Sequence, residues 1–387
     1  MDGERGWCLG RLAGIPIWLS PSWLFIFALV SLGLGLHAVP GWQPNWPTAL
    51  SMVFGGLLAL CFFAGLVLHE LAHALVSRHF GLPVARIRLF LFGGVSEALA
   101  EMRTPREEFW IAVAGPVLSV VLAIVWLAVS ALCAAWPAPA ALVEGSFWLA
   151  VANVTLAAFN LLPGFPMDGG RVLRAALWGA SGDLVRATRW ASGVGRAFAW
   201  LLMAIGFFRL LGGEWLAGAW LVTLGWLIDQ AAQAAYAEVL VSRALDHISV
   251  ARLMNATPLT VAPDLSLREA VETYFLPYPF NSYPVVAGQT PLGLLDRDAV
   301  LQVPRARWPE VRVADVMSPL AALPALHPHM AAKQALPLLA GAGTGRLPVL
   351  EHERLVGLLS QTDVVRYLLW QADGIAPSGS RGREGPA

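Results

Sequence analysis

The sequence is poor in charge for its length. Of its 387 residues, 13% are charged, against roughly 25% in an average soluble domain, while 57% are hydrophobic. So few charges exclude a wholly soluble protein and indicate a membrane protein. The shortage is uneven, because long stretches before about residue 240 are almost uncharged, whereas residues 246–372 carry a soluble domain's mixture. Two regions that face different solvents are therefore expected.

Three further absences narrow the class of protein. The formal net charge is zero, so no electrostatic feature points to a nucleic-acid partner. Cys8, Cys61 and Cys133 are far apart, which argues against a disulfide framework or a thiolate zinc site. The N-terminal segment shows no small-residue cleavage pattern, so we expect a retained first membrane span rather than a signal peptide.

Long apolar runs are abundant. Runs of about 20 residues predict about six transmembrane helices. The loops after the second and fourth runs are rich in Arg, whereas those after the first and third contain neither Lys nor Arg. The positive-inside rule therefore places both termini on the cytoplasmic side of the membrane. The predicted spans are approximately 17–36, 50–76, 109–135, 146–163, 194–212 and 215–237.

The segment VARIRLFLFGGVSEAL, between the second and third predicted spans, favours a short β-hairpin over a helix. Polar and apolar residues alternate at its start, and the apolar run ends at Gly93 and Gly94. At membrane depth such a strand is tolerated only where protein covers it or a water-filled cavity borders it. A short membrane-embedded hairpin is therefore part of the predicted fold.

The charged region contains an internal duplication. Residues 250–254 match residues 313–317, and Gly-Leu-Leu at 293–295 recurs at 357–359, so the shift is about 63 to 64 residues. Each copy has the pattern strand, helix, strand, strand, helix, which predicts a soluble α/β pair. The predicted domains are a transmembrane domain (1–245), the duplicated region (246–372, with copies at about 248–308 and 311–372) and a tail disordered by composition (373–387).

A polar trio interrupts the second apolar run. His69, Glu70 and His73 form the pattern HExxH, in a place where each polar group costs several kcal/mol unless something holds it. Residues four apart project from one face of a helix, so both imidazoles could bind one metal ion with Glu70 beside them. Satisfied core histidines and a proton relay are the alternatives.

Two histidines leave zinc short of the three protein ligands that a catalytic site usually has. NLLPGFPMDGGR, residues 160–171, reaches the same side of the membrane at the end of the fourth predicted span, where Pro163 and Pro166 break the helix. Asp168 follows among glycines, and we expect it to supply the third ligand. Asp168 could instead cap the helix that follows it.

Residues 1 to about 240 resemble the site-2 proteases (family M50), which are intramembrane zinc metalloproteases. VLHELAHAL and NLLPGFPMDGG carry the resemblance, and LFLFGGVSE and the VAGP of residues 113–116 also look like family segments. The resemblance implies that His69, His73 and Asp168 bind one Zn²⁺ ion and that Glu70 is the catalytic base. Asn160 is expected either to stabilise the oxyanion or to fix the bend at Pro163.

The resemblance implies that the protein works in a bacterial cell membrane and that its substrate is a transmembrane segment of a membrane-bound signalling protein. A helix ties up its own amides, so the substrate must unwind locally before its peptide bond can be attacked. The hairpin near 90–95 offers an edge for an extended substrate, and Gly93 and Gly94 would permit close backbone approach. A plain re-entrant turn is the alternative.

Residues 248–372 resemble a tandem pair of cystathionine-β-synthase (CBS) domains, which often bind adenine nucleotides. The family's Ser/Thr-x-x-Asp run is present in the second copy, where Ser360 and Asp363 are candidate ligands for the ribose of ATP or AMP. The first copy departs from the run, with Asp296, Arg297 and Asp298 after its Gly-Leu-Leu strand. One nucleotide site, or a pair that is structural or forms a homodimer, is expected.

The resulting hypothesis is an intramembrane zinc endopeptidase with a cytoplasmic CBS pair as its regulatory module. A CBS-regulated transporter or channel is one alternative, in which His69, Glu70 and Asp168 form an ion or proton path. A transporter typically shows paired half-repeats, and the membrane part has no internal repeat. A catalytically inactive scaffold is the other alternative, and the complete set of ligands and base argues against it.

Overall fold

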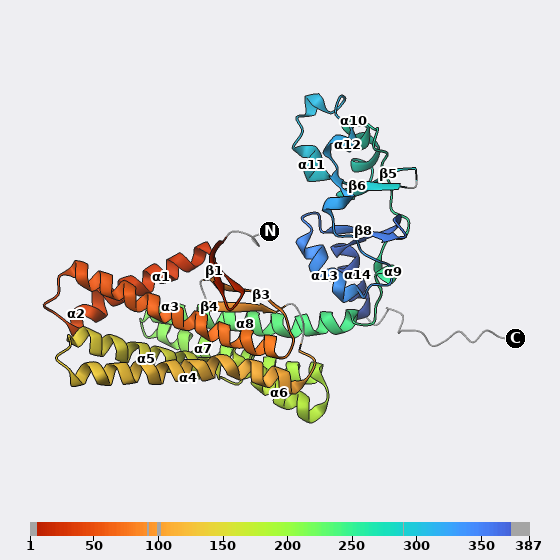
Figure 1. Ribbon diagram of the computed structural model, residues 1–387. Coiled ribbons are helices and arrows are strands. Elements are labelled where there is room, and N and C mark those ends of the chain that lie inside the picture. The colour runs from red at the N-terminus through yellow and green to blue at the C-terminus, as the bar shows by residue number, and fades with distance from the viewer. Residues whose placement is uncertain (1–5, 91–92, 99–101, 289, 373–387) are drawn as a thin grey trace. The chain divides into compact units, whose positions relative to one another are not determined.

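The computed structural model describes residues 6–90, 93–98, 102–288 and 290–372 (Figure 1). It divides into two compact units, Met1–Ala237 and Glu238–Ala387. The domain limits expected from the sequence, 1–245 and 246–372, remain a prediction, and the tail at 373–387 lies outside the described residues.

The first unit consists mainly of long apolar helices, as expected for a multi-pass membrane protein. The side chains of Thr104 and Asp183 accept hydrogen bonds from the amides of Glu107 and Arg186 and so cap the starts of α4 and α7. Five described helices are long and apolar enough to cross a membrane. They are Pro21–Trp42, which comprises α1 (Pro21–Gly33), a π-helical turn (Leu34–Ala38) and α2 (Val39–Trp42), then α3 (Thr48–His79), α4 (Pro105–Ala135), α5 (Ala140–Asn160) and α7 (Leu184–Leu211).

The remaining long helix is α8 (Trp215–Leu245), which contains the sixth predicted span. It is not among the five helices above, so the number of six spans stays a prediction. Between α5 and α7 the chain forms the shorter α6 (Asp168–Ser181), which ends at Gly182 in the left-handed conformation with φ 71°. In Figure 1, α3 lies beside α4, and α6 lies at the end of the unit where α3 finishes and α4 begins.

The predicted hairpin is confirmed, and it belongs to a larger sheet. β3 (Val84–Phe90) pairs antiparallel with β4 (Gly93–Ala98), with Leu89 opposite Gly94. The sheet also contains β1 (Trp7–Leu12) and β2 (Ile15–Leu19), in the order β1-β2-β3-β4, and β2 runs parallel to β3. β1 and β2 were not expected, and the first membrane helix accordingly begins at Pro21 rather than near residue 17. β4 is one of the two edges of the sheet.

The second unit is an α/β pair in which each copy contributes to the core of the other. Val313, from the first helix of the second copy, packs in the cluster that contains Val261 and Tyr283, while Val250, from the first copy, packs with Leu326 and other residues of the second. This exchange explains why the two copies form one compact body. The predicted first strand of each copy is reduced to a single bridge, at Val261 and at Leu326.

The elements of the first copy are α9 (Val250–Leu253), α10 (Leu267–Ala270) with a π-helical turn (Val271–Phe275), β5 (Ser282–Ala287), β6 (Thr290–Asp296) and α11 (Arg297–Leu301). Those of the second are α12 (Val313–Val316), β7 (Ser318–Pro319), α13 (Ala332–Gly341), β8 (Arg346–Glu351), β9 (Arg354–Ser360) and α14 (Gln361–Ala372). Short 3-10 turns cover Arg305–Arg307 and Leu320–Ala322.

Candidate metal centre

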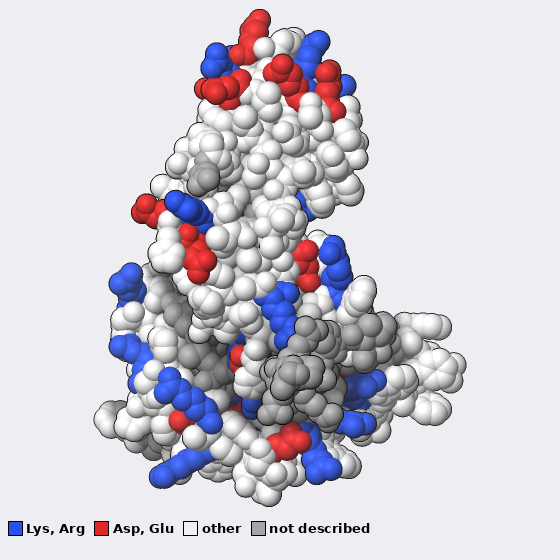
Figure 2. All heavy atoms as spheres, turned by 90° about the vertical axis from the view of Figure 1, so that its right-hand side faces the viewer, with Lys and Arg blue, Asp and Glu red and all other residues white. Residues whose placement is uncertain are grey.

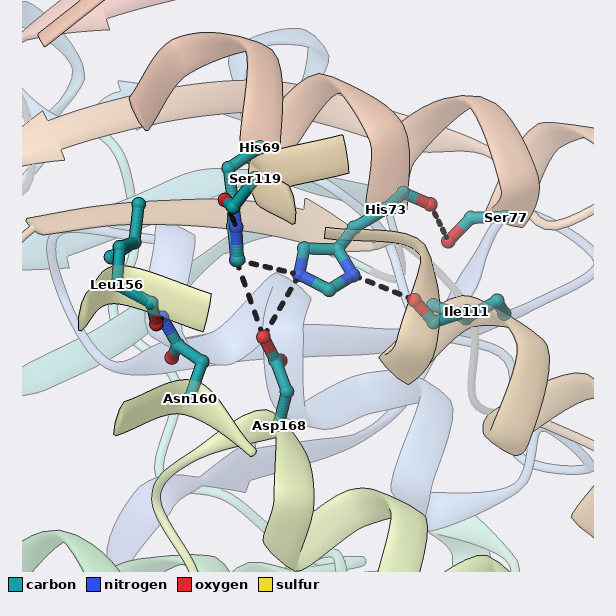
Figure 3. Close-up of polar contacts among 8 residues, drawn as sticks. All are labelled: His69, His73, Ser77, Ile111, Ser119, Leu156, Asn160 and Asp168. Carbon is teal, nitrogen blue, oxygen red and sulfur yellow. Dashed lines mark hydrogen bonds and ion pairs between the residues drawn. The ribbon is translucent and has the colours of Figure 1, made fainter. Parts of the chain in front are cut away.

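The two histidines of the HExxH pattern lie on one face of α3 and are buried. His69 is 2% exposed and His73 is 5% exposed. Their ring atoms Nε2 are 3.2 Å apart, so both imidazoles present the same nitrogen to one place (Figure 3). The helical spacing of four residues therefore has the geometry expected of a shared ligand pair.

Helix α4 provides a hydrogen-bond partner for the Nδ1 atom of each ring. His73 donates through Nδ1 to the backbone carbonyl of Ile111 at 2.6 Å, and His69 Nδ1 lies 2.8 Å from the hydroxyl of Ser119. A carbonyl can only accept, so in a neutral His73 the proton sits on Nδ1 and the lone pair of Nε2 is free. Partners of this kind fix the orientation and tautomer of metal-binding histidines.

Asp168, the first residue of α6, points its carboxylate at the same place. Its Oδ2 lies 3.3 Å from Nε2 of His69 and 3.1 Å from Nε2 of His73 (Figure 3). The N-cap of α6 is Met167, whose side chain makes no capping hydrogen bond, so Asp168 faces the histidines rather than serving as that cap.

The two glycines after Asp168 allow the preceding loop to fold tightly against α6. A Cβ on Gly169 would overlap the carbonyl oxygens of Leu161 and Leu162, and one on Gly170 would overlap the backbone of Gly164. Only residues without a side chain fit this close backbone approach. The two glycines therefore let the start of α6, with Asp168, lie against the residues that follow α5.

The three side chains are suitably arranged for a metal ion. One ligand atom from each lies within 4.8 Å of the others, and no other group of three His, Cys, Asp or Glu side chains within the described ranges meets that condition. Tetrahedral zinc with bonds of about 2.0–2.1 Å separates its ligand atoms by about 3.3–3.4 Å. The observed separations of 3.1–3.3 Å come close to that value. His69, His73 and Asp168 could therefore hold one zinc ion.

Gly115 of α4 leaves the space in which the imidazoles lie. A Cβ added to Gly115 would overlap Nε2 of His73 and would lie 2.5 Å from Nε2 of His69. Real Cβ atoms essentially never approach that closely. The glycine of the VAGP segment is therefore part of the histidine site.

Glu70 lies next to the edge strand. Its side chain is half-buried, and a Cβ on Gly94 of β4 would lie 3.1 Å from its Cδ and 3.2 Å from its Oε1. The structure thus brings the candidate base and Gly94 together, with Gly93 as the neighbouring residue of β4.

Asn160 is the last residue of α5, and Figure 3 draws it beside Asp168. Its Nδ2 donates to the carbonyl of Leu156 at 3.0 Å, one turn earlier in the same helix. One amide hydrogen is thus engaged and the other is available to a ligand. Its role as an oxyanion donor stays a prediction.

The candidate nucleotide residues in the second unit bind each other. Ser360 donates through its hydroxyl to Asp363 Oδ2 at 2.5 Å, and the amide of Asp363 donates to the Ser360 hydroxyl at 3.2 Å. The amide of Ser360 also donates to Asp363 Oδ2 at 3.0 Å, so the two residues form a capping box at the start of α14. In the first copy Asp296 accepts from the amide of Asp298 at 2.9 Å instead. The Ser/Thr-x-x-Asp pattern has a structural use here, and the nucleotide site stays a prediction.

Sequence reasoning missed the partners that α4 provides. Ser119 and Ile111 were not singled out, because a polar residue in an apolar run and a backbone carbonyl give weak signals. Glu108, a buried acid at the start of an apolar run, was a stronger signal that pointed to a partner elsewhere.

Comparison with known proteins identifies the family. Residues 57–146 and 134–202 match peptidase family M50, and residues 250–305 and 313–369 each match the CBS domain. A relative from Mycobacterium tuberculosis named as a zinc metalloprotease, Rip3, is 33% identical over 367 residues, which cover 93% of this chain and 92% of that protein. Zinc metalloprotease MJ0392 of Methanocaldococcus jannaschii is 28% identical over 364 residues, covering 93% of this chain and 95% of that protein.

Among solved structures, the site-2 protease from Methanocaldococcus jannaschii matches with 28% identity and a TM-score of 0.42, over 60% of this chain and 95% of that chain. The names of the relatives favour a protease over the transporter or channel that the sequence left open. The near-complete coverage at 33% identity, together with the family match, shows that the chain belongs to peptidase family M50, the site-2 proteases, and is a membrane zinc metalloprotease with a tandem CBS pair.

Proposed function

We propose that the protein cleaves transmembrane segments of membrane-bound signalling proteins, with zinc held by His69, His73 and Asp168 and with Glu70 as the catalytic base. The observation that carries the proposal is the convergence of His69 Nε2, His73 Nε2 and Asp168 Oδ2, which lie 3.1–3.3 Å apart. Hydrogen bonds from α4 to the Nδ1 atoms hold both imidazoles in place. Glu70 stands on the same helix between the two histidines.

Each group of the proposed site has its own role in peptide-bond hydrolysis. Zinc in a three-ligand site supplies Lewis acidity, which makes water a nucleophile near neutral pH. Glu70 accepts the proton of the attacking water and returns it to the leaving amine. Asn160, with an amide hydrogen not used by Leu156, donates to the oxyanion.

Substrate binding follows from the position of β4. The strand is an edge of the sheet and passes beside the Glu70 carboxylate at Gly94. An unwound substrate that pairs with β4 satisfies its exposed amides by main-chain hydrogen bonds, and Gly93 and Gly94 present no side chain to obstruct it. The scissile bond is thereby delivered next to the base.

The distribution of Arg supports cytoplasmic termini in a bacterial cell membrane. Arg78 lies in the last turn of α3, Arg103 just before α4, Arg106 in the first turn of α4, and α6 carries further Arg residues. Figure 2 shows basic side chains gathered over this end of the first unit. The loop at 134–145, at the other end of α4, has no Lys or Arg. We assign the Arg-rich end to the cytoplasm.

The CBS pair is proposed as the regulatory module, acting through an adenine nucleotide at Ser360 and Asp363 or through homodimer formation. Support comes from the two CBS matches and from the partly buried Asp363 carboxylate, whose hydrogen bonds to Ser360 show that it can accept from a hydroxyl. The hydroxyls of ribose are donors of the same kind.

The test of the protease proposal is cleavage of a reporter transmembrane substrate by the purified full chain, with bound zinc measured on the same sample. Glu70→Gln is expected to keep zinc and to lose about 10²–10⁴-fold in cleavage rate. Glu144→Gln, at an exposed position of α5, is the matched control and should cleave like wild type. Cleavage by Glu70→Gln at the wild-type rate would exclude Glu70 as the base, and wild-type zinc content in Asp168→Ala would exclude Asp168 as a ligand.

A further inference from the structure

One face of α4 carries four residues that all serve the candidate metal centre or the helix that completes it. They lie at positions 108, 111, 115 and 119, and the spacings of three, four and four place them on a single stripe. The last three act on the histidines: the Ile111 carbonyl binds His73, Gly115 leaves room for both rings, and Ser119 binds His69. The first member of the stripe, Glu108, makes no such contact and needs a separate explanation.

Glu108 is 1% exposed and pairs with Arg174 of α6. Arg174 donates through Nε to Glu108 Oε1 at 2.6 Å, and a second guanidinium nitrogen, Nη2, contacts the same oxygen. The Arg174 side chain is itself only 13% exposed. This is a charge-assisted hydrogen bond in a low-dielectric setting, and it ties α6 directly to α4.

Arg174 also holds the loop that leads into α6. Its guanidinium carbon lies 4.9 Å from the centre of the Phe165 ring, a cation–π contact. Phe165 stands three residues before Asp168 and Arg174 stands six residues after it. One side chain therefore fixes the segment on both sides of the candidate third ligand.

Stability alone does not account for such a pair. Apolar residues of similar volume usually stabilise a protein as well as a buried ion pair does, and the best-attested use of a buried pair is to fix the register of packed elements. The register fixed here is that of α6 against α4, and α4 is also the helix that orients both histidines. The pair therefore fixes the position of Asp168 relative to α4, the helix that also orients the two imidazoles.

We propose that Glu108 and Arg174 are positioning residues that hold Asp168 at the distance from His69 and His73 at which the three donors share one metal ion. The inference rests on the proposed function, because it takes Asp168 as a zinc ligand. Neither Glu108 nor Arg174 touches the substrate or the metal; they act through the placement of α6.

The test measures zinc affinity of the purified full chain by chelator competition, and the visible spectrum of the Co²⁺-substituted protein as a report on ligand geometry. Glu108→Gln should raise the zinc dissociation constant about 10–100-fold, the range found when partners of metal ligands are removed. Arg174→Lys keeps the charge but lacks the forked guanidinium, so it should weaken zinc binding as well. It also serves as the second variant if Glu108→Gln does not fold.

Asp229→Asn is the matched control. Asp229 is also a buried acid paired with an Arg, since Arg196 Nε lies 2.9 Å from its Oδ1, but this pair joins α7 to α8 and not α6 to α4. It should lower thermal stability and leave zinc affinity and the Co²⁺ spectrum at wild-type values. An equal loss of zinc affinity in Asp229→Asn would overturn the proposal, because the effect would then be general destabilisation.

A double-mutant cycle separates this inference from the protease proposal. With Asp168→Ala already present, Glu108→Gln should cause no further loss of zinc affinity, because its effect passes through Asp168. An additive further loss would show that Glu108 acts elsewhere. If Asp168→Ala lowers zinc affinity while Glu108→Gln and Arg174→Lys do not, the positioning role is wrong and the ligand assignment stands. If Asp168→Ala itself retains wild-type affinity, the ligand assignment fails first.

Discussion

Adding one methyl group at Gly115 should remove metal binding while leaving the helix intact. In Gly115→Ala the new Cβ would lie 2.5 Å from His69 Nε2 and would overlap His73 Nε2, whereas contacts of 3.0–3.4 Å are already tight. The rings must therefore move by at least about 0.5 Å, and metal–ligand distances in a working site tolerate only about 0.2 Å. Zinc affinity should fall by at least about 100-fold, at the upper end of the effect of losing a ligand's supporting partner.

The same substitution should not unfold α4, because Ala is favoured over Gly in a helix interior by about 1 kcal/mol. Loss of zinc without loss of helical content, measured by chelator competition and circular dichroism, is the expected outcome. Gly56→Ala is the matched control, since a Cβ at that position of α3 meets nothing within 4 Å. Wild-type zinc affinity and cleavage in Gly115→Ala would show that the imidazoles do not occupy the place described and would refute the reasoning.

Three further outcomes are expected. Ser119→Ala, which removes the partner of His69 Nδ1, should weaken zinc binding about 10–100-fold in chelator competition, while Ser130→Ala, whose hydroxyl donates to Val143 on α5, should not; equal effects would contradict the role given to Ser119. ATP or AMP should raise the melting temperature of the full chain and Asp363→Ala should abolish that rise; no shift with wild type would favour the dimerising interpretation. The Ser266 amide and hydroxyl donate to the carboxylate of Glu269 and hold the pKa of that carboxyl below the usual 4.5. The stabilising contribution of Glu269 is therefore present above pH 4.5 and is lost as the pH falls through the lowered pKa. Glu269→Gln should reduce the dependence of the melting temperature on pH in that range, and an unchanged dependence would contradict this.

The parts of the site that are local in sequence could be predicted from it. The pairing of His69 with His73 needs only the pitch of one helix, and the buried polar trio needed an explanation wherever the helix lay. The pitch of a helix could not predict that Asp168 reaches the histidines, because its approach depends on the proline-broken loop and on Gly169 and Gly170. The family motifs supplied that step, because the position of Asp168 taken alone favoured a helix cap.

The partners on α4 could not be predicted, because they depend on how one apolar helix is rotated against another. Nothing in the sequence says which face of residues 105–135 meets α3, so Ser119 and Gly115 gain their meaning only from packing. The same holds for Glu108, whose burial could be suspected but whose partner Arg174 lies 66 residues away. Long-range side-chain pairs of this kind are set by tertiary structure.

The sequence clearly indicated the apolar spans and the duplication, whereas it did not indicate the strands β1 and β2. The segment from Ile15 to Leu19 is as apolar as the helix that follows it, so hydropathy assigned its end to the first span. Its strand conformation comes from pairing with β3, which lies some 65 residues later in the chain. Short apolar runs cannot be assigned to strand or helix by periodicity alone.

The edge strand β4 has a mechanical consequence for any substrate that pairs along it. Six residues of β4 match six substrate residues, which span about 9 Å as helix and about 20 Å when extended. A substrate therefore lengthens by about 11 Å as it is engaged, more than a third of the roughly 30 Å hydrocarbon core. One flank of the substrate must slide along the membrane normal by that amount, so a segment clamped at both membrane surfaces by bulky domains would resist cleavage until one clamp is released.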